Sequence, residues 1–204
     1  NAFTIIGTDS GTETNKLTNA TGGFINVENL TGGDGADQFV FIDTMTIDGD
    51  VDGGGTTEGP DVLNLDAYTT TVDIKITADG ADHGLAGSTS GVTDPIGVAF
   101  DNIDSLIGDG SPGNTLTGPN AANDWVISGL NQGTLNGLAF SGMSNLTGGN
   151  LVDTFTFEDV GELTGATGII GGDGSAGDDD TLIGDDSNAF TIIGTDSGTE
   201  TNKL

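Results

Sequence analysis

NAFTIIGTDSGTETNKL, residues 1–17, recurs without a single change as residues 188–204, which gives a period of 187 residues. Identity over seventeen residues does not arise from biased composition, so the sequence contains one long repeat and the start of another. We therefore predict two parts, residues 1–187 as one repeat unit and residues 188–204 as the beginning of the next identical unit. No Pro-rich linker separates them, so we expect an excised stretch of a longer tandem array whose copies are joined head-to-tail.

A shorter pattern, F-x-[NG]-[apolar]-x-[NS]-L-[TI]-G, occurs three times inside the period. It reads FINVENLTG from Phe24, FDNIDSLIG from Phe100 and FSGMSNLTG from Phe140. An apolar residue at every third position also fits one face of a helix, but Gly and Asn follow closely, and Gly costs about 1 kcal/mol in a helix interior. The pattern indicates short strands that turn a corner.

A third pattern places Asp or Asn directly before alternating apolar residues, as in DQFVF, DVLNL, NDWVI and DTFTF. A turn residue that leads into a period-two string is typical of a short strand. We expect inward-facing residues among Phe39, Phe41, Leu63, Leu65, Trp125, Ile127, Phe155 and Phe157. The pattern starts at Asn1, Asp37, Asp61, Asn114, Asn123, Asp153, Asp180 and Asn188.

The fold class predicted from these strings is all-β, because the expected strands are short and bounded by Gly, Asn or Asp. Asp37 and Asp61 are 24 residues apart and Asp153 and Asp180 are 27 apart, close to one coil of a β-solenoid. Nested repeats favour stacked coils over a sandwich, since each coil buries the face that its neighbour leaves exposed. A loop or bulge is expected at residues 78–97, the least regular stretch.

The charge balance is extreme, with 32 acidic residues and only three basic ones, Lys16, Lys75 and Lys203. A net charge of −29 excludes nucleic acid and anionic membrane surfaces as partners, because both require a basic patch. No apolar run is long enough to span a bilayer. Such a chain can be disordered, but nine Phe residues placed in regular strings favour a folded core. Divalent counterions are expected among the carboxylates.

Two motifs point to calcium. GGDGADQFV, from Gly32, matches the nonapeptide G-G-x-G-x-D-x-U-x, and DGDVDG, from Asp48, matches the D-x-D-x-D-G spacing of calcium loops. A degraded nonapeptide, GGDGSAGDDDTLI, begins at Gly171. Solvated turn residues are the alternative interpretation of each Asp. The predicted metal ligands are Asp34, Asp37, Asp48, Asp50, Asp52, Asp173, Asp178 and Asp180.

Catalytic constellations are scarce. His83 is the single His and there is no Cys, so nucleophilic catalysis through a triad has little to draw on. Carboxylate pairs suited to glycoside hydrolysis occur by chance in so acidic a chain. The sequence therefore predicts no enzymatic activity.

The strings in residues 114–149 and GGDGADQFVF from Gly32 resemble the repeats of giant secreted bacterial adhesins of the filamentous-haemagglutinin-like and repeats-in-toxin-like kinds. The resemblance implies a right-handed parallel β-helix at the bacterial cell surface or in the medium, with a role in adhesion, biofilm or an extracellular filament, and host or matrix glycans as further partners. The alternative is a glycan-binding or polysaccharide-active, lyase- or epimerase-like β-helix. A lyase of that kind uses a basic side chain, which this repeat offers only at Lys16 and Lys75.

Overall fold

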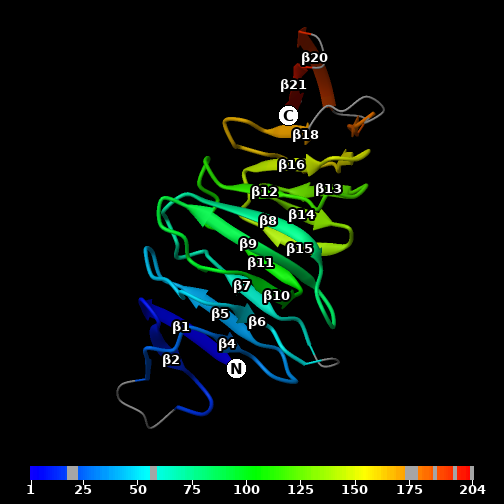
Figure 1. The fold of residues 1–204 in the computed structure, drawn as a ribbon. Helices are drawn as coiled ribbons and strands as arrows, with labels where there is room; N and C mark the ends of the chain where they lie inside the picture. Colours follow the sequence, from blue (N-terminus) through cyan, green and yellow to red (C-terminus); the bar gives the residue numbers. More distant parts are fainter. Residues whose placement is uncertain (18–22, 56–58, 173–178, 186–187, 195–196, 203–204) are drawn as a thin grey trace.

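A computed structural model describes residues 1–17, 23–55, 59–172, 179–185, 188–194 and 197–202, and for residues 188–202 only the strands and their pairing. These residues form strands and no helix, so the expected all-β class is confirmed. Figure 1 shows the strands stacked along one long axis, from β1 and β2 at the blue end to β18 near the C-terminus.

Two mixed sheets contain nearly all of the strands. Sheet A has eleven, in the spatial order β19 (Thr181–Ile183), β17 (Thr154–Phe157), β13 (Asp124–Gly129), β14 (Gln132–Leu135), β15 (Leu138–Ser141), β11 (Ser105–Ile107), β7 (Val62–Asn64), β5 (Gln38–Phe41), β1 (Ala2–Gly7), β2 (Ser10–Glu13) and β3 (Phe24–Ile25). Sheet B has eight, in the order β18 (Ile169–Gly172), β16 (Asn145–Gly149), β12 (Thr115–Thr117), β8 (Val72–Asp79), β9 (Leu85–Gly91), β10 (Phe100–Ile103), β6 (Val51–Asp52) and β4 (Leu30–Thr31).

The chain crosses from one sheet to the other after every segment, and we call each such segment a half-coil. Most half-coils are single strands, but three are antiparallel meanders of three strands: β1–β3 and β13–β15 in sheet A and β8–β10 in sheet B. Each half-coil pairs in parallel with the half-coil two steps later, as β5 does with β7 and β16 with β18. Within the two sheets, antiparallel pairs occur only inside the meanders.

The recurring Phe pattern belongs to the third strand of each meander. Phe24, Phe100 and Phe140 lie in β3, β10 and β15, and each stands opposite a glycine of the strand before it. The Phe24 ring covers Gly11, where a Cβ would come within 2.6 Å of the ring edge. Those glycines are Gly11, Gly87 and Gly133.

The third position of the same pattern turns the corner between the sheets. Asn26, Asn102 and Gly142 have φ values of 57°, 55° and 68°. Asn and Gly are the residues that adopt this left-handed conformation at the lowest cost, which explains why the pattern admits only those two types there. The apolar residue that follows, such as Ile103 or Met143, is buried in the core.

Two expectations need correction. A parallel β-helix requires parallel pairing throughout, whereas the meanders make both sheets partly antiparallel. At residues 78–97, where a loop or bulge is expected, β9 and the end of β8 instead pair as a hairpin, and a bulge lies at its start, between Ile76 and Ala78.

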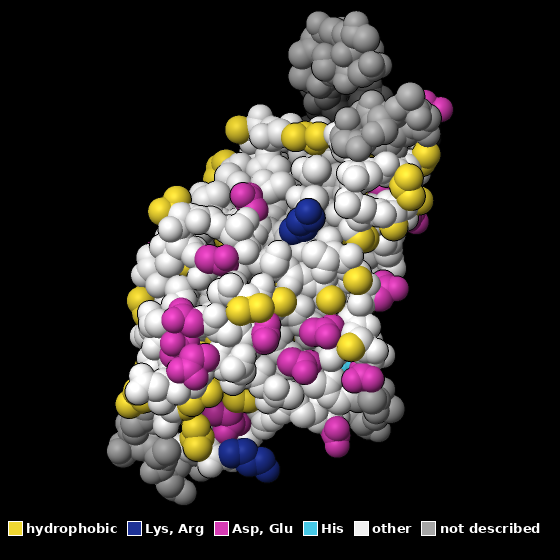
Figure 2. Space-filling view, in the orientation of Figure 1, with side chains coloured by type: hydrophobic (Ala, Val, Ile, Leu, Met, Phe, Trp, Pro, Cys, Tyr) yellow, Lys and Arg dark blue, Asp and Glu magenta, His cyan; other side chains and the backbone are white. Residues whose placement is uncertain are grey.

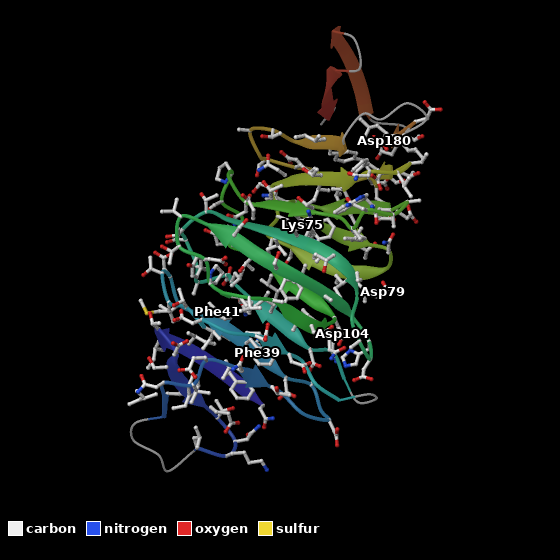
Figure 3. All side chains as sticks on the ribbon, in the orientation of Figure 1. Phe39, Phe41, Lys75, Asp79, Asp104 and Asp180 are labelled. Carbon is white, nitrogen blue, oxygen red and sulfur yellow. The ribbon has the colours of Figure 1, made fainter. Side chains whose placement is uncertain are left out.

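The core lies between the two sheets and includes every residue predicted to face inward, all eight of which are buried. Phe3 stacks on Phe39 at 5.1 Å between ring centroids, and Trp125 stacks on Phe155 at 5.6 Å. Like residues therefore stack on like across parallel strands. Figure 3 shows Phe39 and Phe41 on β5 near the N-terminal end of this stack.

The two identical segments adopt the same hairpin. In the first copy Phe3 pairs with Glu13 and Ile5 with Gly11. In the second, β20 (Asn188–Gly194) and β21 (Ser197–Asn202) pair Phe190 with Glu200 and Ile192 with Gly198. Each of these numbers is shifted by 187, so the register is identical, as the repeat predicts.

Candidate functional site

Polar residues line the corner at which the chain enters sheet A. Each stands directly before a strand of that sheet, where a turn residue is needed. We call this set the corner ladder, and Figure 3 shows two of its members, Asp104 and Asp180, on the same side of the molecule. Its members are Asn1, Asp37, Asp61, Asp104, Asn123, Asp153 and Asp180.

In the N-terminal half of the ladder, each backbone amide donates to the carboxylate of the next coil. The Asp37 amide donates to Asp61 Oδ1 at 2.7 Å, and the Asp61 amide donates to Asp104 Oδ2 at 2.8 Å. The Asn1 amino group lies 2.6 Å from Asp37 Oδ1 and occupies the equivalent position one step earlier. The 24-residue spacing between Asp37 and Asp61 is therefore one full coil.

The C-terminal half follows the same rule with one chemical difference. The Asn123 amide donates to Asp153 Oδ1 at 2.9 Å, and the Asp153 amide donates to Asp180 Oδ1 at 2.8 Å. The side-chain Nδ2 of Asn123 donates a second hydrogen bond to Asp153 Oδ1 at 2.7 Å. A side-chain amide thus supplies a proton that no carboxylate of the N-terminal half can supply when ionised.

Glycines of sheet B abut the ladder. A Cβ at Gly32 would lie 2.5 Å from Asp37 Oδ2, and one at Gly148 would lie 2.1 Å from Asp153 Oδ2. Gly53 and Asp61 are related in the same way, at 2.6 Å. The Gly-Gly-x-x-x-Asp part of the nonapeptide therefore serves here to pack a strand end against a ladder residue.

His83 is held against the ladder by the turn between β8 and β9. The Asp82 amide donates to Asn102 Oδ1 at 2.8 Å, and the Gly80 amide donates to the Gly84 carbonyl at 3.0 Å. Asn102 is the left-handed corner residue of β10, so the turn is fixed to the point at which the chain passes from sheet B to sheet A.

The imidazole contacts acceptors on both sides. Nδ1 lies 3.1 Å from Asp104 Oδ1, and Nε2 lies 3.1 Å from the Gly54 carbonyl oxygen and 3.7 Å from Asp61 Oδ2. Both partners accept hydrogen bonds only, so both can be satisfied at once only when both ring nitrogens carry protons. The geometry therefore favours the imidazolium form.

The electrostatics of this cluster follow from its burial. The pKa of Asp61 is raised to about 6, chiefly by burial; the charges of Asp37 and Asp104 add to the rise, while the Asp37 amide and His83 oppose it. Burial alone would lower the pKa of His83, but the hydrogen bond to Asp104 and that carboxylate's charge outweigh it, so the pKa is raised. The cluster is suited to holding protons near neutral pH.

The same three residues are the metal-binding candidate of the described part of the chain. There, Asp61, His83 and Asp104 are the one group of three or more His, Asp or Glu residues whose ligand atoms all lie within 4.8 Å of one another. Calcium prefers six to eight oxygen ligands, and this set offers two carboxylates and an imidazole whose nitrogens already face acceptors. Proton binding fits the arrangement better than a hard cation does.

The residues predicted to bind calcium are distributed along the stack. Asp34 is exposed before β5, and Asp48 and Asp50 are exposed around β6. Asp52 is half-buried and accepts hydrogen bonds from the Gly54 amide and from Asn102 Nδ2, both at 2.8 Å. Within DGDVDG only Val51–Asp52 forms a strand, and burial alternates along it so that Gly49, Val51 and Gly53 are buried while the three carboxylates face outward. These carboxylates are not part of the one group of the described residues whose ligand atoms converge.

The remaining predicted ligands belong to the ladder or lie outside the described residues. Asp37 is buried and Asp180 is exposed, and both are ladder members. Asp173 and Asp178 fall outside the described residues. The His83 cluster was not predicted, because Asp61 and Asp104 are 43 residues apart and only the β8–β9 hairpin brings His83 between them.

Trp125 and Tyr68 are both fully buried. Trp125 stacks on Phe155, and the Tyr68 hydroxyl donates to the Thr93 carbonyl at 2.9 Å. The inward placement predicted for Trp125 is confirmed.

Comparison of the sequence with protein-family models and curated proteins, and of the fold with solved structures, finds no match. The described residues contain no helix long and apolar enough to cross a membrane.

Proposed function

We propose that this chain is one repeat of a non-catalytic structural or adhesive protein of the bacterial cell surface or extracellular medium. In this proposal the repeat is a β-solenoid, a right-handed parallel β-helix interrupted by meanders, and copies follow one another head-to-tail as a rod. The adhesin resemblance supports the extracellular setting.

The observation that carries the proposal is the combination of an exact sequence repeat with open sheet ends. Sheet A ends at β3 and β19, and sheet B ends at β4 and β18. Open strand edges are a template for further pairing. Because β20 and β21 repeat the register of β1 and β2, a following copy has the same means to continue both sheets. Head-to-tail contacts of this kind generate rods rather than closed oligomers.

Small-angle X-ray scattering from proteins of one, two and four copies tests this directly. A continuous rod keeps a constant cross-section while its length rises in proportion to copy number. A cross-section radius that grows with copy number, or scattering typical of flexibly joined beads, would contradict the rod.

Calcium binding to the acidic surface is the second part of the proposal. Figure 2 shows acidic side chains gathered over the N-terminal half of one face, with few basic side chains near them. Asp48 and Asp50 are exposed and Asp52 is half-buried, so these three carboxylates are open to cations from solvent. Divalent cations reduce such self-repulsion and stabilise the folded state by mass action.

A thermal unfolding series with calcium, with magnesium and with chelator tests the cation. We expect calcium to raise the midpoint and chelator to lower it at a fixed ionic strength. A variant with Asp48, Asp50 and Asp52 replaced by Asn should lose most of the calcium response. An unchanged midpoint with chelator would remove calcium from the proposal and leave the rod untouched.

A further inference from the structure

The described strands of one repeat form an odd number of half-coils. The described strands of sheets A and B number eleven and eight, and nine of them belong to the three meanders. Counting each meander as one half-coil gives thirteen, which alternate between the sheets without exception: the first, β1–β3, lies in sheet A, and so does the last, β19. The next half-coil in sequence begins with β20 and β21, and strict alternation assigns it to sheet B.

The two meanders that follow earlier half-coils obey the same pairing rule. The third strand of each pairs in parallel with the half-coil two steps earlier: β10 pairs with β6, and β15 pairs with β11. The strand that follows a meander does the same in the other sheet, as β11 does with β7 and β16 with β12. Applied to a following copy, the rule pairs its β3 with β18 and its β4 with β19.

The register follows from the inward residues. Phe100 pairs with Val51 and Phe140 with Leu106, so in these two meanders the Phe of the third strand stands opposite a buried apolar residue. The inward residue of β18 is Ile169, which pairs with buried Leu146. Phe24 of a following copy should therefore stand opposite Ile169.

The residue after each inward residue points outward, and in the end strands these outward residues are exposed. Ile25 is 67% exposed at one end, and Ile170 and Ile183 are 44% and 43% exposed at the other. By the same register, Ile25 of a following copy is the neighbour of Ile170, and Thr31 is the neighbour of Ile183. Large apolar side chains at both sheet ends are those that continued stacking would cover.

The number of strands that each sheet gains per copy also favours placing the following meander in sheet B. If each copy repeated the placement of the first, sheet A would gain eleven strands and sheet B eight with every copy. The difference of three strands, about 14 Å at 4.8 Å per strand, would accumulate along the rod. Exchange of the sheets gives each of them nineteen strands for every two copies.

We infer that consecutive copies exchange sheets, so that the meander opening each copy is added to the sheet opposite to that of its predecessor. The interaction surface is the end formed by β18 and β19, and its partner is the following copy of this same repeat. The inference rests on the proposed tandem rod and adds its internal symmetry: the structural period is two copies.

Disulfide trapping in a protein of two consecutive copies tests the exchange. The sequence has no Cys, so each variant carries only the introduced pair. One protein combines Ile170→Cys in the first copy with Ile25→Cys in the second, and its counterpart combines Ile183→Cys with Thr31→Cys. The matched alternatives combine Ile183→Cys with Ile25→Cys and Ile170→Cys with Thr31→Cys. Neighbouring parallel strands hold Cα atoms within disulfide range, whereas opposite sheets lie about 10 Å apart.

Exchange predicts that the first two proteins form an intramolecular disulfide under mild oxidation at low protein concentration and that the alternatives do not. Bonding of the alternatives would overturn the exchange while leaving the continuous rod in place. Failure of all four proteins, with circular dichroism showing each one folded, would overturn the exchange and the rod together. Having two proteins for each arrangement protects the result against one variant that does not fold.

Discussion

The two halves of the corner ladder share one geometry and differ in chemistry. In the N-terminal half three carboxylates follow one another, and the pKa of the middle one, Asp61, is raised to about 6. In the C-terminal half Asn123 stands before Asp153 and donates a side-chain hydrogen bond to it. Stacked coils thus require a hydrogen-bond acceptor at each corner, but not a charge. At Asp153 the neighbouring Asn123 amide supplies the proton, whereas at Asp61 the proton has to be bound by the carboxylate or supplied by His83.

The largest expected effect on the free energy of unfolding comes from the stacked aromatic residues of the core, which both halves share. Phe155→Ala should lower the free energy of unfolding by about 3 to 5 kcal/mol, because it empties a buried site stacked against Trp125. Phe39→Ala should cost a similar amount through its stacking with Phe3. Urea denaturation measures both, and a loss below about 1 kcal/mol for either would show that packing also differs between the halves.

Replacing a glycine that packs beside the ladder by alanine should destabilise both halves equally. A Cβ at Gly53 would come within 2.0 Å of the Asn102 carbonyl oxygen, and one at Gly148 within 2.0 Å of the Gly171 carbonyl oxygen. Gly53→Ala and Gly148→Ala should each cost about 3 kcal/mol. Gly35→Ala is the control, because a Cβ there meets nothing within 4 Å. Equal losses for all three variants would remove the ladder packing as the cause.

Replacing a ladder carboxylate by an amide should change the stability differently in the two halves of the ladder. Ionised Asp61 destabilises the native state above its native pKa of about 6, so Asp61→Asn should stabilise the protein by about 2 kcal/mol at pH 8. The gain should disappear below about pH 4, where Asp61 is protonated in both the folded and unfolded states. Asp153→Asn should bring no gain, because Asn123 already supplies its proton. Stabilisation by both variants, or by neither, would contradict the difference between the halves.

The smallest effect concerns His83. Its pKa is raised in the folded state, so its contribution is complete below the ordinary pKa of about 6.5 and is lost as the pH rises through the folded value. The free energy of unfolding should therefore fall between pH 6 and 8, and His83→Gln should flatten that slope. A slope unchanged in the variant would assign the pH dependence to Asp61 alone.

Much of the fold could be predicted from short-range patterns. Alternation identified all eight inward residues, since period two in a strand fixes which side chains face the core. The turn pattern also identified six of the seven ladder residues. Asp104 was missed as a ladder residue because it lies inside the Phe pattern, which indicated a corner without indicating which sheet the chain enters.

Pairing direction could not be predicted. The hairpin turn GTDSG resembles any other Gly-rich corner, and only the left-handed Asp9, with φ of 49°, shows that β2 reverses onto β1. The same holds for Asn131 between β13 and β14, with φ of 52°. The His83 cluster depends on a third reversal, the β8–β9 hairpin, and could not be predicted for the same reason. Tertiary pairing, not sequence spacing, brings together residues that are 43 positions apart.

The central claim is that one two-sheet core passes through successive copies without interruption, and electron cryomicroscopy of a protein of several copies tests it most directly. Nineteen strands per sheet for every two copies give a repeat of about 90 Å along the rod at about 4.8 Å per strand. We predict unbroken strand ladders across each seam and a structural period of two copies. Separate domains joined by linkers, or ladders that end at β18 and β19 in every copy, would contradict the account.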